Sequence, residues 1–238
     1  MKPSLPVLLS FNAGYVDTAG YLALQGLFTA HVTGNFVTIG AALAFGTSGI
    51  VTKLSALPVF CVVILFTRLL GHGLQARERR VLPAVLTLKF ALLVIGATLA
   101  IWWGPFANSD SWRAWVTGMV IVAAMAIQNA AHRIYFGATP PSTLMTGNTT
   151  QIMIDIADTI RGLPAETRAA TINRLRQMIK AVISFAVGAT LAALFFSATH
   201  MWCFVVAPLV AGLVRLGGDA VSPGGPHGAA GGRPLRAA

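Results

Sequence analysis

Long stretches of the chain are apolar over a length that matches the thickness of a lipid bilayer. About 20 consecutive apolar residues cross the hydrocarbon core as a helix. Short polar segments separate such stretches, which indicates an all-α, polytopic transmembrane bundle of about six spans. The stretches cover residues 4–28, 55–76, 82–103, 113–135, 178–199 and 200–216.

Two further helical segments begin at the same tripeptide. Thr33-Gly34-Asn35 opens the apolar segment 34–49, and Thr146-Gly147-Asn148 opens the more polar segment 147–160. The second carries two aspartates, each costing about 2.5–3.5 kcal/mol near the centre of a membrane helix. We therefore expect short, interrupted or re-entrant helices at these places.

The order of segments around the tripeptides indicates an internal repeat. Each copy follows a long apolar helix and precedes a short helix, a polar loop and two apolar spans. The single membrane domain 1–216 then consists of two halves, 4–103 and 113–216. Internal symmetry of this kind is common in membrane folds.

The placement of Lys and Arg bears on topology, because basic residues favour the cytoplasmic side. With neither short segment crossing, the halves are inverted and the basic loops 77–80 and 161–176 are both inside. With both crossing, the 161–176 loop lies outside, against this rule. Segment 34–49 is apolar enough to cross alone, which gives seven spans and an external N-terminus. We prefer six.

Composition supports a lipid environment. Of the 238 residues, 55% are hydrophobic and 10% are charged, against about 25% charged residues in soluble domains. The net charge of +10 arises from clusters between apolar runs, which argues against nucleic acid as a partner. Cys61 and Cys203 lie in apolar runs, where we expect packed, unreactive thiols.

The two ends of the chain are interpreted separately. The start resembles a signal peptide, but Asn12 and Asp17 interrupt its apolar run and no clear cleavage site follows. We expect a retained helix. The segment 217–238 is rich in Gly and Pro, and we expect it to be disordered.

Asp17 is the first candidate for chemistry, since a carboxylate within a membrane helix must pair, face water or be protonated. We expect a coupling or substrate site there, with a structural carboxylate as the alternative. Asn12 lies just over one turn earlier, on roughly the same helical face.

The paired tripeptides are the next candidates. Thr33 and Thr146 are good N-cap residues, while Gly34 and Gly147 allow a close approach of backbone and ligand. A helix that begins at membrane depth points free N–H groups towards an anionic or polar solute. Simple helix capping is the alternative for both copies, which end in Asn35 and Asn148.

Polar residues within other spans complete the candidate set. Gln128 and Asn129 either bridge helices or contact a solute. Arg68 and Lys89 are near enough to helix ends to snorkel, and a pair of either with Asp17 stays open. His31 alone does not indicate a metal site.

Enzyme and metal signatures are missing from the sequence. It contains no Gly-x-Ser-x-Gly, His-Glu-x-x-His, phosphate loop or dinucleotide fingerprint. Asp155 and Asp158 share a helix face, which we interpret as solvated. We therefore predict no catalytic residue, cofactor or metal.

One long motif is shared with a known family. The stretch from Gly14 to Leu24, GYVDTAGYLAL, and the stretch from Gly26 to Asn35, GLFTAHVTGN, resemble the signature of YoaK-like bacterial membrane proteins. Gln128-Asn129-Ala130 and Met145-Thr146-Gly147-Asn148 resemble its second-half motif. The resemblance covers about residues 8–216 and implies a multi-pass protein of the bacterial inner membrane, without implying an activity.

The leading functional hypothesis is a transporter of a small solute or ion, built from two inverted halves around a midplane polar site. Its expected partners are the lipid bilayer and an unknown solute, and a homo-oligomer with further copies of the chain stays open. The alternative is a non-transporting membrane protein, either an assembly partner or an intramembrane enzyme. A channel is the third hypothesis and requires an oligomer or a continuous polar path.

Overall fold

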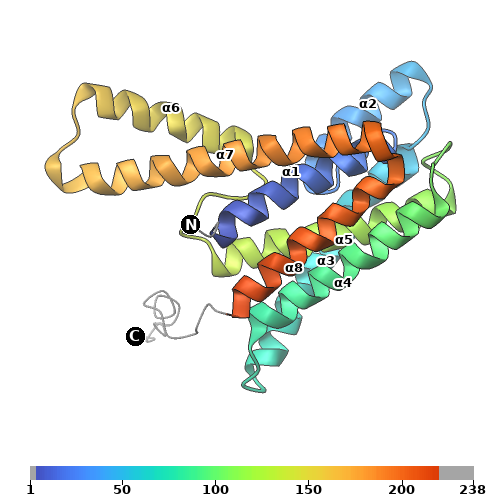
Figure 1. Ribbon diagram of the computed structural model, residues 1–238, viewed down its shortest axis with the longest axis horizontal. Coiled ribbons are helices and arrows are strands. Elements are labelled where there is room, and N and C mark those ends of the chain that lie inside the picture. Colours follow the sequence, from blue (N-terminus) through green and yellow to red (C-terminus); the bar gives the residue numbers. More distant parts are fainter. Residues whose placement is uncertain (1–3, 220–238) are drawn as a thin grey trace, which may run out of the picture.

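The computed structural model describes residues 4–219, and the regular elements of this part of the chain are all helices (Figure 1). The helices are α1 (Leu5–Ala23), η1 (Val32–Gly34), α2 (Asn35–Phe45), α3 (Ile50–Gln75), α4 (Val81–Trp103), α5 (Trp112–Tyr135), α6 (Met145–Arg161), α7 (Ala165–Thr199), η2 (His200–Val205) and α8 (Val206–Asp219).

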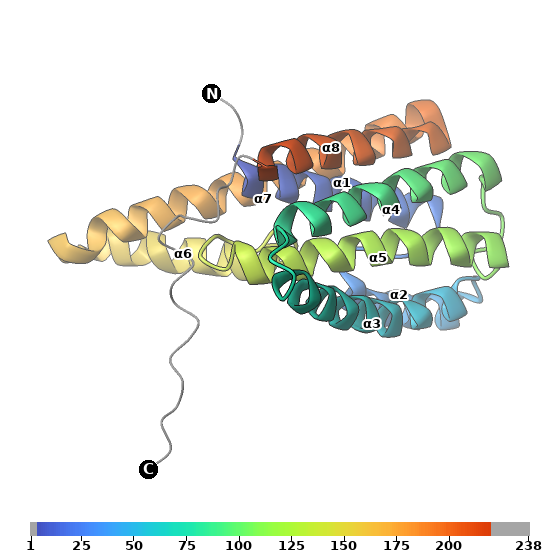
Figure 2. The same ribbon diagram turned by 90° about the horizontal axis from the view of Figure 1, so that it is seen from below.

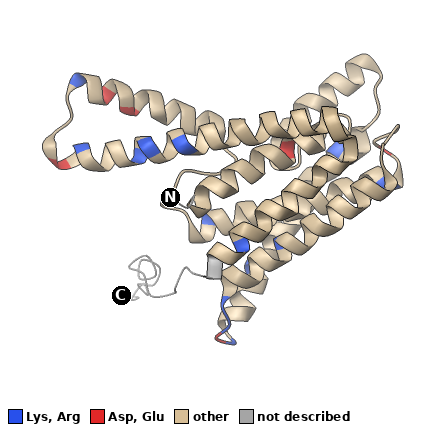
Figure 3. Cartoon of the chain, viewed as in Figure 1, with Lys and Arg blue, Asp and Glu red and all other residues tan. Residues whose placement is uncertain are grey.

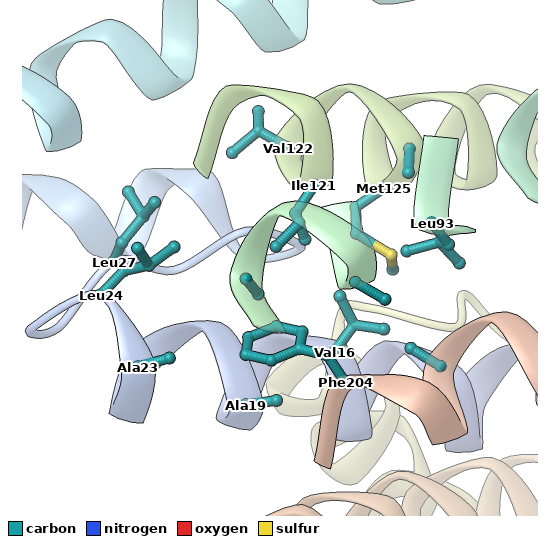
Figure 4. Packing of buried hydrophobic residues seen from close by; sticks show 14 of the residues in the cluster. Val16, Ala19, Ala23, Leu24, Leu27, Leu93, Ile121, Val122, Met125 and Phe204 are labelled. Atoms are coloured by element: carbon teal, nitrogen blue, oxygen red, sulfur yellow. The ribbon is translucent and has the colours of Figure 1, made fainter. Parts of the chain in front are cut away.

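The core of the bundle forms where α1, α4, α5 and η2 meet. α1 packs along α7, α5 lies against both α3 and α4, and α8 packs on α4 and α1. The apolar side chains at the centre come from distant parts of the chain (Figure 4). They include Val16 and Ala19 of α1, Leu93 of α4, Met125 of α5 and Phe204 of η2.

α1 ends at Ala23, five residues before the end of the apolar stretch that suggested it. Gln25 and Gly26 have positive φ angles of 50° and 89°, which turn the chain back. The residues 24–34 form what we call the first return loop. Its leucines Leu24 and Leu27 stay buried in the core, so an apolar run here marks a packed loop.

A second return loop, residues 136–144, follows α5 and leads into α6. The short helices that follow the two return loops project in opposite directions from the bundle (Figures 1 and 2). α2 ends at Phe45, and Gly46, with a left-handed φ of 65°, caps its last turn.

α7 is longer than its apolar stretch because it begins at Ala165 rather than near residue 178. No Gly or Pro occurs from 165 to 187, so nothing interrupts the helix where it becomes polar. Its polar first part pairs with α6 in a hairpin that projects beyond the bundle, and Lys and Arg gather there and at the α3–α4 turn (Figure 3).

Within residues 4–219, four runs are long and apolar enough to cross a membrane: α3, α4, α5 and a 53-residue run from Ala165 to Gly217. The last run reverses at His200, where φ is 50°, so it contains both α7 and α8. α1 falls outside this set, since Asn12 and Asp17 lower its hydropathy. A helical membrane bundle is thus confirmed. α8 includes 217–219, and residues 220–238 of the expected tail lie outside the described part.

Candidate functional site

Asp17 lies in the second half of α1 and holds the first return loop. The carboxylate oxygen Oδ1 accepts hydrogen bonds from the backbone N–H groups of Thr29 and Ala30, each at 2.7 Å, and of His31 at 3.4 Å. Only 5% of Asp17 is exposed. These donors satisfy a buried carboxylate without a cation.

The first Thr-Gly-Asn tripeptide closes the same loop through its asparagine. Asn35 accepts from Phe28 N and donates to Phe28 O, both at 2.8 Å. Thr33 is exposed, and Gly34, rather than Thr33, occupies the N-cap position of α2 without a side-chain cap bond. Thr33 is therefore not the cap that the sequence suggested.

The second tripeptide repeats this arrangement in part. Asn148 donates to Pro141 O at 2.9 Å, again a carbonyl seven residues earlier. α6 begins at Met145, so Thr146 lies inside its first turn and is exposed. Gly147 has open space where a Cβ would lie. Capping by Thr146 is therefore also wrong.

A buried lysine lies among polar groups from three helices. Lys89 of α4 is 0% exposed, and its Nζ donates to Gln128 Oε1 of α5 at 2.5 Å. With its amide oriented to satisfy both of its groups, Asn12 of α1 accepts from Lys89 Nζ at 2.8 Å and donates to Ala207 O of α8 at 3.1 Å.

Gln128 connects this lysine to the second return loop. Its Nε2 donates to Leu9 O of α1 at 2.9 Å and to Ser142 Oγ at 3.3 Å. The neighbouring Asn129 accepts from Thr143 Oγ1 at 2.7 Å and donates to Met125 O. We call Asn12, Lys89, Gln128 and Ser142 the lysine cluster.

The candidate residues therefore form two groups rather than one. Asp17 and the first tripeptide belong to the first return loop, while Gln128, Asn129 and Asn148 belong to the second. Leu9, which contacts Gln128, and Asp17 are eight residues apart on α1, or about 12 Å at 1.5 Å per residue. Among the described residues, no hydrogen bond joins Asp17 to the lysine cluster.

A pocket of about 220 Å³ opens beside the lysine cluster, between the last turns of α5 and the second return loop. It is lined by Asn129, His132, Arg133, Gly137, Thr139, Pro141, Ser142, Thr143 and Leu144. A wider, shallow groove of about 760 Å³ follows α6 and includes Thr146. Its lining carries no charged residue, so the smaller pocket has the richer chemistry.

Of the two aspartates of α6 that were expected on a solvated face, Asp158 is exposed and Asp155 is not. Asp155 is fully buried and accepts two hydrogen bonds from Arg174, at 2.6 and 2.9 Å. Arg174 lowers the pKa of Asp155 below its ordinary value, chiefly through these bonds. Within residues 4–219, no His, Cys, Asp and Glu cluster suits a metal ion.

Lys89 and His132 are the functional candidates that sequence reasoning missed or placed wrongly. Lys89 does not snorkel, because it lies two turns inside α4 and is fully buried. An ionisable residue that deep in an apolar run is itself a signal. Arg68, by contrast, is exposed on α3, and nothing in the sequence singles out His132.

Comparisons with known proteins place the chain in a family. The family described as "Protein of unknown function (DUF1275)" matches residues 5–216. The UPF0700 transmembrane protein YoaK of Bacillus subtilis (strain 168) is 30% identical over 201 residues, which cover 81% of this chain and 83% of that protein. No solved structure matches. The chain therefore belongs to the YoaK-like, DUF1275 family of integral membrane proteins.

Proposed function

We propose that this protein transports a small solute across the bacterial cytoplasmic membrane, through two inverted halves that share the lysine cluster. The observation that carries the proposal is the fully buried Lys89, which contacts amides of both halves. Ionisable groups at membrane depth are costly and mark substrate, ion or proton paths.

The packing of helices supports the repeat. If each helix of α1–α4 is matched in order with the helix at the same place in α5–α8, the helix pairs that pack together in the first arrangement correspond to pairs that also pack together. The contact of α1 with α7 becomes that of α5 with α3, and α2 with α3 becomes α6 with α7. Likewise, α4 with α5 becomes α8 with α1. The matching bonds of Asn35 and Asn148 fit the same symmetry.

Helix length and polarity together support six spans: α1, α3, α4, α5, α7 and the continuous segment of η2 and α8. The 11 residues of α2 rise about 17 Å, roughly half of the hydrocarbon core. α6 is held to the polar first part of α7 by the Asp155–Arg174 pair. With three spans in each half, the halves are inverted relative to each other.

The charge distribution supports an orientation. The α3–α4 turn and the tip of the α6–α7 hairpin lie at one end of the bundle, together with most of its Lys and Arg (Figure 3). The opposite end holds Lys53 and Arg113 at the starts of α3 and α5. We assign the basic end to the cytoplasm.

In this mechanism Lys89 is the charged group that a solute meets. In the present state its ammonium is solvated by Asn12 and Gln128, which offsets part of the cost of burying it. When the halves rock against each other, an anionic or polar group of the solute takes the place of these amides. The solute then exchanges its contacts between Asn12 in the first half and Gln128 in the second half.

Asp17 has a different role in this proposal. Its Oδ1 already accepts from the backbone of the first return loop, so the geometry favours the structural alternative for this carboxylate. The loop that it fixes carries Thr33, Gly34 and Asn35 to the start of α2. We propose that these residues position the loop rather than bind the solute.

A static membrane protein is the second candidate. The observation in its favour is that Lys89 bridges two amides in a closed network, as a structural cation does. In that case the lysine cluster fixes the fold, and the protein acts as an assembly partner.

The test is flux through proteoliposomes, screened with panels of small carboxylates, amino acids and inorganic ions. Lys89→Met, which has similar volume and no charge, is expected to abolish the flux of any solute found while the protein still elutes as a folded species. Arg68→Met, an exposed cation in another span, serves as the control and should keep the flux. Normal flux through Lys89→Met would remove Lys89 from the path, and no flux with any panel would favour the static alternative.

A further inference from the structure

The pocket beside the second return loop contains an unsatisfied imidazole. His132 is 6% exposed, and its Nδ1 is buried without a hydrogen-bond partner among the described residues. Its Nε2 contacts Thr139 Oγ1 at 3.3 Å, and that hydroxyl donates to Phe136 O at 2.8 Å. Because the Thr139 proton is used, His132 Nε2 donates, and Nδ1 is the free nitrogen.

The charge around this pocket has one sign. Arg133 lies exposed in the lining and forms no ion pair with a described carboxylate. The lining contains no Asp or Glu. Behind it, Ser142 Oγ accepts from Gln128, which in turn accepts from Lys89. The pocket is therefore joined to a buried ammonium by two hydrogen bonds.

Further donors face the same region. The hydroxyl of Ser142 has no acceptor for its own proton among the described hydrogen bonds, and Ser142 is 2% exposed. Leu144, the N-cap residue of α6, also lines the pocket, so the first amides of a 17-residue helix lie close by. Such amides lack partners within the helix and favour anions.

We infer that this pocket binds a small anion with a carboxylate or similar oxygen group, and that a solute of the transporter enters there from the basic end of the bundle. The second part rests on the proposed function. The cavity volume of about 220 Å³ lies below the 300 Å³ at which pockets for drug-sized ligands begin, roughly. An anion of a few non-hydrogen atoms therefore fits this pocket.

A carboxylate bound in this pocket lies beside the His132 ring, and its negative charge favours the protonated imidazole. Among the elements packed on α5, α1 carries Asp17, which is bonded to the first return loop, and Lys53 and Arg113 lie at the opposite end of the bundle. The second return loop has no charged residue, and the charged groups of these helices at this end are Arg133 on α5, Arg68 on α3 and Lys89 on α4. All three are cations, which oppose a further positive charge. The proton therefore enters together with the anion, and binding strengthens as pH falls.

The test uses formate as the probe, with methylammonium as the cationic counterpart at equal ionic strength. Saturation-transfer NMR on the full-length protein in detergent should show saturable binding of formate that is stronger at pH 6 than at pH 8. Arg133→Gln should weaken it about tenfold or more, as expected for a lost charge-assisted hydrogen bond. Arg113→Gln, at the opposite end, is the matched control and should bind as the wild type does.

His132→Gln separates a binding role from a structural one. Glutamine offers a donor and an acceptor but does not titrate, so the variant should remain folded and lose the pH dependence. Formate that binds all variants alike, preference for methylammonium, or no binding at all would each overturn the inference. If flux of another solute persists without formate binding, the transporter stands and this site fails. Formate binding without any flux leaves the site and removes the transporter.

Discussion

At the scale of single residues, three buried ionisable side chains are satisfied by three different means. Backbone N–H groups satisfy Asp17, amide side chains satisfy Lys89, and a guanidinium satisfies Asp155. The sequence identified Asp17 as important because a carboxylate in an apolar run is rare. It did not reveal its partners, because a loop that turns back onto its own helix leaves no periodic signal. The sequence also did not reveal that Lys89 is buried, because the burial of a side chain depends on how the helices pack.

The Asp155–Arg174 pair gives a pH dependence to the α6–α7 hairpin. The hydrogen bonds of Arg174 hold the pKa of Asp155 below its ordinary value, so ionised Asp155 stabilises the hairpin above the pKa of the unfolded chain. That stabilisation is lost as pH falls through the lower pKa of the folded state. The protection of α6 amides against hydrogen exchange, relative to the intrinsic exchange rate at each pH, is expected to be high at pH 7 and to fall at strongly acidic pH.

Asp155→Asn is the variant that tests this dependence. Half of the Arg174 side chain is exposed (51%), so solvent screening reduces the loss to about 1–2 kcal/mol. Exchange at pH 7 should then be faster and its acid dependence weaker. Asp158→Asn, exposed one turn further along α6, is the control. Equal exchange rates in both variants would show that the pair does not hold the hairpin.

At the scale of helices, apolar length located the spans well and their ends less well. The expected stretches 82–103 and 113–135 differ from α4 and α5 by one residue at their starts. α1 and α7 differ more, because apolar length reports the lipid environment rather than helix continuity. Positive φ angles at Gln25 and Gly26 end α1 inside an apolar run. α7, by contrast, begins with a charged part that lies outside its apolar stretch and is nevertheless helical.

The crossing of α1 and α7 depends on two glycines. A Cβ at Gly188 would meet the Phe11 carbonyl oxygen, and a Cβ at Gly14 would meet the Phe185 carbonyl oxygen. Small residues allow such close contact between membrane helices. Gly188→Ala is expected to push the helices apart and to destabilise the protein by about 1–3 kcal/mol, as overpacking does.

The thermal transition in detergent measures this effect. Gly188→Ala should lower its midpoint, whereas Gly73→Ala should leave it unchanged or raise it slightly, because nothing lies within 4 Å of a Cβ at Gly73 and alanine favours helix. A midpoint for Gly188→Ala equal to that of the wild type would mean that the backbones are further apart than described.

At the scale of the whole molecule, we propose that the fold consists of two related halves, and the short helices after their return loops project in opposite directions (Figures 1 and 2). The tripeptide repeat and the order of segments predicted this symmetry, which the packing of helix pairs supports. This symmetry does not bring the two tripeptides together, because their asparagines bond to different return loops. Each loop packs beside the helix that precedes it, and Asp17 and Leu9, which contact the first return loop and Gln128, lie about 12 Å apart along α1. Inverted symmetry can therefore place equivalent residues at different depths.

The three candidate topologies differ at two positions of the chain. With six spans, residues 4 and 170 both face the cytoplasm. With seven, where α2 crosses alone, residue 4 lies outside and residue 170 inside. With eight, where α6 crosses as well, both lie outside. Single cysteines at these positions distinguish all three, in a background in which Cys61 and Cys203 are replaced by alanine. Cys61 needs replacement because it is exposed.

We expect Ser4→Cys and Ala170→Cys to resist a membrane-impermeant maleimide in intact spheroplasts and to react after permeabilisation. Asn108→Cys, exposed in the α4–α5 loop at the opposite end, should react from outside and shows that the reagent reaches the protein. The physical basis is that a 17 Å α2 cannot cross the core and that the basic hairpin favours the cytoplasm. Labelling of residue 170 from outside would contradict the inverted arrangement, and with it the shared site between the two halves.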